Sequence, residues 1–313
     1  MYSTVVKKVF LFIAIFMIAS LACDLSVSVA PSTSPALLPT NTMIPGTEAP
    51  TQISASLTPI PATSASSTTP TAPQPSFEGV EISVDPLSIV LSPGLASGAR
   101  GSQFSRAEGD NVAPWDVTPG HTQLKLEGYL LQDKFHQPQI YVYPAQAYAE
   151  MYSPAFESIR RLDNILYAPD GPNINNPLPA VPFFNAAQVF SSNIQVISFQ
   201  NGGGVRFLTE YAQSAASVNN HDLFYHFQGV TRDGAYYIVA ILPITAPVLA
   251  ETGDAGAVLP VGGVPYPYYA DPNADLQAYY TAVTALLNST SPEAFTPTIN
   301  QLDLLIQSIQ IGQ

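Results

Sequence analysis

Four apolar runs joined by short turn signals constrain the fold of this chain more than any other feature. The turn signals are Asn-Gly-Gly-Gly at 201–204 and Arg-Asp-Gly at 232–234, and the runs span residues 194–200, 205–211, 223–231 and 235–242. Asn and Gly tolerate the positive φ that tight hairpins need, and runs of this length suit β-strands. The pattern predicts a four-strand antiparallel meander.

The second run of the meander alternates in side-chain character. Successive side chains of a strand point to opposite faces, which places Val205, Phe207, Thr209 and Tyr211 on one face and Arg206, Leu208 and Glu210 on the other. We therefore expect one face of the sheet to be wetter than the other.

Other segments carry weaker signals for strands and helices. Strands are predicted at 80–84, 88–91, 122–131 and 139–143, and a short helical turn at 186–190. Helices are predicted at 155–167, with its buried face at Phe156, Ile159, Leu162, Ile165 and Leu166, at 276–287, where Asp275 can cap the first turn, and at 299–309. This order of elements predicts an α+β fold, an antiparallel sheet built around the meander with helices packed on one face.

The first 22 residues have the form of a secretory signal. Lys7 and Lys8 precede 14 nearly apolar residues at 9–22, and the chain's single cysteine, Cys23, follows directly. The ending Ser-Leu-Ala-Cys resembles the lipobox of bacterial lipoproteins, in which the cysteine becomes the lipidated N-terminus. This resemblance implies a signal peptide at 1–22 and lipidation of Cys23. Ser20 stands where the lipobox usually has leucine, which leaves ordinary signal cleavage or an uncleaved anchor as alternatives.

The next segment is rich in Ser, Thr and Pro. Residues 31–76 contain 10 Pro, 8 Ser and 10 Thr among 46 residues, and Glu48 is their only charged residue. Such a composition buries too little apolar surface to offset chain entropy, and proline keeps it extended. The sequence predicts a lipidated N-terminus and disordered tether over 23–78, followed by a single α+β domain over 79–313.

The stretches GGGVRFLTEYAQ at 202–213 and LFYHFQGVTRDGAYYIVAILPI at 223–244 resemble those of uncharacterised bacterial envelope lipoproteins with the same layout of signal, tether and domain. A meander that leads to the terminal helix LDLLIQSIQI is also similar to the PsbP-like α+β fold. These resemblances imply a fold and a layout, and they bring no known catalytic residue.

Charge and residue counts exclude several classes of protein. A formal charge of -13 repels phosphate backbones and disfavours nucleic-acid binding. One cysteine cannot form an internal disulfide or a Cys-x-x-Cys redox pair. We expect no cofactor. We also expect no metal site at His221 and His226, because they are five positions apart on or beside one strand, and an odd separation points their side chains to opposite faces.

Other possible catalytic features have simpler structural explanations. The acids Glu127, Glu210, Asp222 and Asp233 lie on or beside predicted strands, where acids are usually solvated. Glycoside hydrolysis needs two acids that face each other across a cleft, which spacing in sequence cannot test. The segment 271–275 begins like a calcium loop, but Leu276 and Ala282 stand where that loop needs Gly and Glu. No catalytic residue is assigned.

The aromatic residues near the C-terminus are a more promising feature. Tyrosines give flat amphipathic contact surfaces suited to sugars or peptides, and five of them cluster here, Tyr266, Tyr268, Tyr269, Tyr279 and Tyr280. The alternative is that these rings only cover the sheet. The sequence thus predicts a membrane-anchored extracytoplasmic lipoprotein of the cell envelope, with a non-enzymatic domain that binds a polymer or protein partner. An envelope hydrolase with an unrecognised carboxylate site is the alternative.

Overall fold

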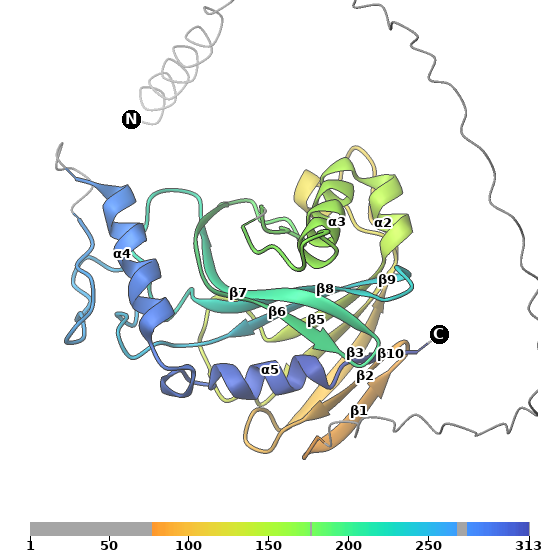
Figure 1. Ribbon diagram of the computed structural model, residues 1–313, viewed down its shortest axis with the longest axis horizontal. Helices are drawn as coiled ribbons and strands as arrows, with labels where there is room; N and C mark the ends of the chain where they lie inside the picture. The colour runs from red at the N-terminus through yellow and green to blue at the C-terminus, as the bar shows by residue number, and fades with distance from the viewer. Residues whose placement is uncertain (1–76, 176, 268–273, 313) are drawn as a thin grey trace, which may run out of the picture. The chain divides into compact units, whose positions relative to one another are not determined.

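A seven-stranded antiparallel sheet is the centre of the molecule in the computed structural model, which describes residues 77–175, 177–267 and 274–312. The predicted signal peptide, Cys23 and the tether up to residue 76 lie outside the described residues. The strand order is β3-β4-β5-β9-β8-β7-β6 (Figure 1). The strands are β3 (Gly98–Phe104), β4 (His121–Glu127), β5 (Gln139–Pro144), β6 (Ala187–Phe199), β7 (Gly202–Ala212), β8 (Phe224–Thr231) and β9 (Tyr236–Pro243). The predicted meander is confirmed as β6 to β9.

A small second sheet joins the two ends of the described domain. Its order is β1-β2-β10, and its strands are β1 (Val80–Val84), β2 (Leu87–Leu91) and β10 (Gln310–Ile311). The C-terminal strand pairs with β2 through Gln310 opposite Ser88 and Ile311 opposite Leu87. This pairing holds the end of the chain against its first hairpin.

The helices lie on both sides of the large sheet. In Figure 1, α2 (Ala145–Met151) and α3 (Ser153–Leu166) lie above the sheet, whereas α5 (Ile299–Gln307) lies below it. The helix α4 (Leu276–Ser289) contacts β6, and the short 3-10 helices η1 (Pro114–Asp116) and η2 (Pro292–Ala294) lie in loops. The α+β prediction is confirmed, but its placement of the helices on one face is wrong.

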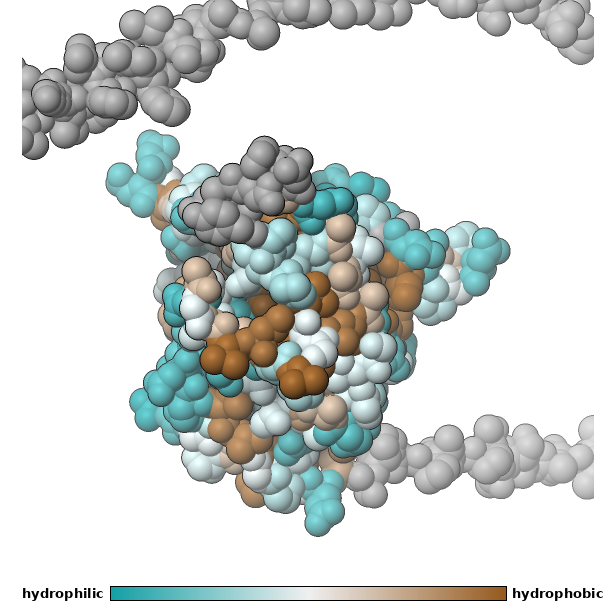
Figure 2. Space-filling model, turned by 90° about the vertical axis from the view of Figure 1, so that its left-hand side faces the viewer, coloured by the Kyte–Doolittle hydropathy of each residue, from teal (hydrophilic) through white to brown (hydrophobic). Residues whose placement is uncertain are grey.

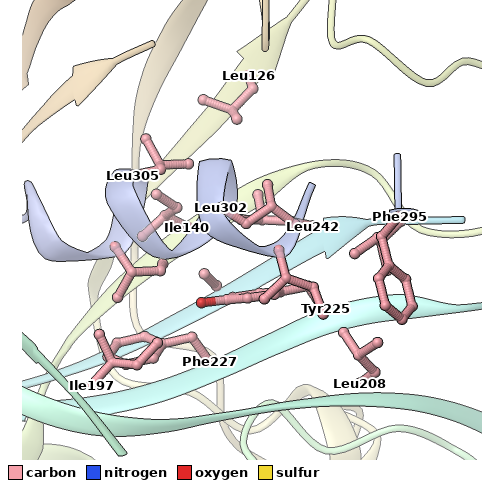
Figure 3. Close-up of a cluster of buried hydrophobic side chains, with 14 of the residues drawn as sticks. Leu126, Ile140, Ile197, Leu208, Tyr225, Phe227, Leu242, Phe295, Leu302 and Leu305 are labelled. Carbon is pink, nitrogen blue, oxygen red and sulfur yellow. The ribbon is translucent and has the colours of Figure 1, made fainter. Parts of the chain in front are cut away.

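Two separate hydrophobic clusters explain why helices are needed on both faces. The α3 side buries Leu162 and Ile165 with Phe207 and Val239. The α5 side buries Leu302 and Leu305 with Leu208, Tyr225 and Phe227, among other residues that Figure 3 shows. Every residue of β8 is buried, as is every residue of β9 except Tyr236. Strands that are apolar on both faces require a layer on each.

The expectation of a wetter face on β7 is wrong for the same reason. Arg206 and Glu210 point away from Phe207, yet they are 5% and 1% exposed, because α5 and the loops cover their side of the sheet. Arg206 pairs with Asp303 of α5, with Nε 3.3 Å from Oδ1, and Tyr225 donates to the same oxygen at 2.8 Å. These bonds satisfy polar groups that burial would otherwise leave unpaired.

The glycines after Asn201 have a different role from the predicted turn. Gly202, Gly203 and Gly204 belong to β7, and the turn consists of Gln200 and Asn201. A Cβ on Gly204 would lie 2.3 Å from the Gln228 carbonyl oxygen and 2.4 Å from the Phe227 ring, so the glycine makes room for the neighbouring strand β8 and its aromatic side chain. The second turn is confirmed, since Gly234 has φ +72°.

One helix prediction is partly confirmed and one is wrong. The helix α3 buries Ala155, Ser158, Leu162 and Ile165, whereas Phe156 is 49% exposed, so the buried face is rotated from the predicted one. No helical turn forms at 186–190, because β6 begins at Ala187 and pairs with Ala212 of β7. Pairing with a neighbouring strand overrides the local preference of this segment.

The cap of α4 is confirmed, because the Asp275 carboxylate accepts from the Ala278 N–H at 2.8 Å.

A tyrosine-lined pocket as the candidate functional site

A pocket of about 270 Å³ lies between α4, the segment at 217–218 and the long loop that follows β9. The helix brings Tyr279 to it, and the loop brings Tyr266. Leu249, Leu259 and Val264 add an apolar lining. This is the side of the molecule that Figure 2 presents, where brown apolar surface gathers among hydrophilic groups.

Tyr279 is a buried and hydrogen-bonded residue of the pocket wall. Its ring is 5% exposed and meets the ring of Tyr266 edge to face, with centroids 5.0 Å apart. Its hydroxyl accepts a hydrogen bond from the Val218 N–H at 2.9 Å. Burial raises the pKa of Tyr279 to about 12, so the hydroxyl stays neutral at physiological pH.

Tyr280 supports the pocket from beside it. Its hydroxyl accepts from the Ala216 N–H at 3.2 Å and donates to the Ala216 carbonyl at 2.9 Å. Its ring centroid lies 5.2 Å from that of Tyr279. The two tyrosines of α4 therefore hold the backbone at 216–218 in place, and with it one wall of the pocket.

The predicted tyrosine cluster thus divides into three parts. Tyr266 and Tyr279 come together as pocket lining, and Tyr280 holds the wall beside them. Tyr268 and Tyr269 lie outside the described residues. The prediction did not include Val218, Leu249, Leu259 or Val264, because single apolar residues in a loop give no periodic signal that indicates a binding site.

The rim of the pocket carries a few polar groups. Asp254 is the only carboxylate among the described lining residues, and its Oδ2 accepts from the Thr252 hydroxyl at 2.8 Å. The Ser217 hydroxyl donates to the Gly253 carbonyl at 3.4 Å. An apolar floor with a small number of polar groups at its rim is the usual composition of a ligand site.

Behind the pocket wall, Glu210 is a buried carboxyl. Its Oε2 accepts from the Asn219 N–H at 3.2 Å, and the side chain is 1% exposed. Burial raises the pKa of Glu210 to about 8, although the Asn219 bond opposes this shift. The expectation that this acid is solvated is wrong, because the residues between β7 and β8 fold over it. At neutral pH the carboxyl is largely protonated.

The histidines are dispersed between the core and the surface. His226 is fully buried, and burial lowers its pKa to about 3. Burial also lowers the pKa of His136 to about 4. The ring of His221 instead bonds Asp222 at 2.6 Å near the surface. Within the described residues, no group of three or more His, Cys, Asp and Glu side chains could hold a metal ion.

No protein-family model, curated protein or solved structure matches this chain. The residues themselves therefore carry the functional argument.

Proposed function

We propose that this chain is an envelope lipoprotein, anchored to the extracytoplasmic face of the cell membrane by a lipid on Cys23, whose domain binds an envelope polymer or protein partner. The signal-like residues 1–22 and the single cysteine support the anchor, as does the resemblance to envelope lipoproteins. None of the helices in the described part of the chain is long and apolar enough to cross a bilayer.

The pairing of Tyr266 with Tyr279 is the observation that carries the binding function. The two rings meet edge to face in a pocket of about 270 Å³ with an apolar lining, which fits one aromatic or aliphatic group of a partner. Exposed Val258 and Val261 lie on the same loop, so a partner that fills the pocket would also cover apolar surface beside it.

An envelope hydrolase is the weaker alternative. Glycoside hydrolysis needs a carboxylic acid and a carboxylate that both reach the substrate. The pocket offers Asp254 alone among its described lining residues, and Glu210, which could hold a proton at neutral pH, is 1% exposed. The geometry therefore favours binding over hydrolysis.

The anchor is tested by the mass of the mature protein. We expect the mature chain to begin at Cys23 with a mass increment for acyl chains, and Cys23→Ala to release the protein from the membrane fraction or to stall processing. A mature chain that carries no lipid and begins at another residue would refute the anchor.

The pocket is tested by filling it. We would titrate the full chain with N-acetyl-phenylalanine amide, N-acetyl-leucine amide and N-acetylglucosamine and detect contact by saturation-transfer NMR. Ala257→Trp places a large ring in the pocket and should abolish the signal of whichever probe binds. Ala282→Trp, on the exposed face of α4, is the matched control and should keep it. Signals that are equal in both variants, or no signal with any probe, would refute a ligand pocket here.

A further inference from the structure

The open half of the large sheet presents a second surface, separate from the tyrosine pocket. The main sheet contacts of α2 are with β5 and β9, and those of α3 are with β7 and β8. On the same face of the sheet, no described helix packs extensively on β3 or β4, whereas at the end of β5 the buried Tyr143 ring lies 4.8 Å from the ring of Tyr148 of α2. This face continues across β3, β4 and β5. The strand registers place nine side chains on it, Arg100, Ser102 and Phe104 from β3, His121, Gln123 and Lys125 from β4, and Gln139, Tyr141 and Tyr143 from β5.

Aromatic rings form a row across these three strands. Phe104 stacks on His121, with centroids 5.2 Å apart and an angle of 10° between the rings. His121 in turn lies 4.8 Å from Tyr143. Because β3 is the edge strand, no strand among the described residues pairs with it on the side away from β4, and Phe104 is 46% exposed. A flat apolar ring at the sheet edge is thus available for stacking.

A hollow of about 430 Å³ lies next to Phe104 and His121, at the end of the strands. Gln103 and Asp85 contribute polar groups to its lining, and Pro86 and Pro144 contribute apolar ones. The hollow therefore offers an aromatic wall together with hydrogen-bonding groups, which a single flat hydrophobic patch would not.

The middle of this face, around His121, Gln123 and Gln139, carries hydrogen-bonding groups without net charge. The His121 Nδ1 lies 2.9 Å from the Pro119 carbonyl, which can only accept, so Nδ1 holds the proton and Nε2 is left as an acceptor. Burial lowers the pKa of His121, which keeps the ring neutral at pH 7. The Gln123 amide donates to the Gln139 amide oxygen at 2.7 Å. Each amide has further donor or acceptor capacity.

The positive and negative side chains near this face are equal in number. Arg100 pairs with Glu127 at 2.8 Å, and Lys125 and Asp85 lie toward opposite ends of β4. The whole chain carries a formal charge of -13 and so repels polyanions. A partner for this surface should therefore be uncharged, rich in hydroxyl groups and flat on at least one face.

We propose that this face, from Phe104 along β4 toward Lys125, is a binding surface for an uncharged polysaccharide. The apolar face of a sugar ring stacks on Phe104, and its hydroxyl groups bond the His121 Nε2 and the Gln123 and Gln139 amides. From His121 to Lys125 the strand advances about 14 Å, so the surface accommodates several linked rings rather than one.

The test measures the binding of neutral oligosaccharides to the full chain. Chitohexaose and cellohexaose are the neutral probes, and polygalacturonate and oligothymidylate are the anionic ones. Trp115, the only tryptophan of the chain, lies in the connection between β3 and β4 and reports binding through its fluorescence. We expect at least one neutral probe to bind and both anionic probes to bind at least tenfold more weakly.

Matched variants locate the surface. Phe104→Ala should weaken binding of the neutral probe about tenfold, whereas Phe156→Ala, which removes an equally exposed ring from α3, should change it less than twofold. Gln123→Leu should weaken it too, and Lys125→Gln should not. Ala257→Trp should leave this binding unchanged, which separates it from the tyrosine pocket. Thermal unfolding confirms that each variant is folded.

Three results would overturn the proposal. The first is that neither neutral probe binds. The second is that Phe104→Ala and Phe156→Ala lose affinity for the neutral probe equally. The third is that an anionic probe binds more tightly than the neutral ones and that its affinity depends on Lys125. The last result would assign the face to a polyanion instead.

Discussion

One half of the seven-stranded sheet is covered on both faces, and the other half is covered on one. In the covered half, all eight residues of β8 are buried. In the open half, β4 alternates, with Thr122, Leu124 and Leu126 buried and the residues between them partly or fully exposed. The difference shows that the residue composition of a strand depends on how many of its faces are covered by another layer. A face that is buried on folding must be apolar, or its polar groups must be hydrogen-bonded within the protein.

The two halves also use polar residues differently. In the covered half, Gln228 is fully buried, and its amide accepts from the Tyr237 hydroxyl at 2.5 Å and donates to the Pro179 carbonyl at 3.2 Å. In the open half, Gln123 and Gln139 bond each other and still face solvent. Polar groups are therefore bonded inside the protein in the first half, and in the second they remain partly exposed to solvent.

The largest expected effect comes from truncating a ring in the covered half. Phe227→Ala removes a fully buried ring on the α5 side of the sheet and should lower the free energy of unfolding by about 3 to 5 kcal/mol. Phe104→Ala, in the open half, should lower it by less than about 1 kcal/mol, because the side chain is already 46% exposed at the edge of the sheet. Urea unfolding of both variants makes the comparison, and equal losses would contradict the division into two halves.

An effect of similar size is expected where α5 joins the sheet. Arg206→Met leaves the Asp303 carboxylate buried without its ion-pair partner and should cost about 3 to 5 kcal/mol. Replacing both residues, as Arg206→Met with Asp303→Leu, should recover much of that loss, since no buried charge remains. Denaturant unfolding of the single and double variants decides this, and a double variant as unstable as the single one would contradict it.

A smaller effect is expected at the β8–β9 turn. Gly234 has φ +72°, which a β-branched residue can hardly adopt, so Gly234→Val should lower stability by about 1 to 3 kcal/mol. Gly256 has no residue within 4 Å of the position that a Cβ would take, and Gly256→Val should cost far less. Thermal unfolding measures both, and an equal decrease in melting temperature would mean that the turn is not strained.

The last expected effect is a pH dependence in the covered half. The pKa of Glu210 is raised by burial to about 8 in the folded protein, above its unfolded value, so the folded state binds more protons between about pH 5 and pH 8. Stability from this group is therefore lost as pH rises through that window, by at most about 1.4 kcal/mol per pH unit.

Glu210→Gln removes the titrating group and keeps an acceptor for the Asn219 N–H. The variant should gain stability relative to the unchanged chain from pH 5 to pH 8, whereas replacing exposed Glu127 by Gln should not produce this trend. Unfolding free energies measured along the pH series test it. A constant difference between the Glu210 variant and the unchanged chain would show that the carboxyl titrates normally.

Some of the candidate site could be predicted from the sequence. The tyrosine-rich segment indicated where aromatic surface would gather, and Asp275 marked the start of the helix that carries Tyr279 and Tyr280. The sequence could not show that the backbone at 216–218 would lie against that helix, because the two segments are about sixty residues apart and meet only in the folded state. The β3–β5 surface was missed for the same reason.

By itself, the sequence determined the meander, its second turn and the mixed α+β class, because apolar periodicity and the backbone preferences of Gly and Asn act over a few residues. Only the tertiary structure decided that helices cover both faces of β7 to β9, that Glu210 is buried and that Phe104 stacks at a sheet edge. These outcomes depend on which distant segments exclude water from a given face. Local sequence does not encode that choice, since the same side chain can be buried or solvated according to what packs against it.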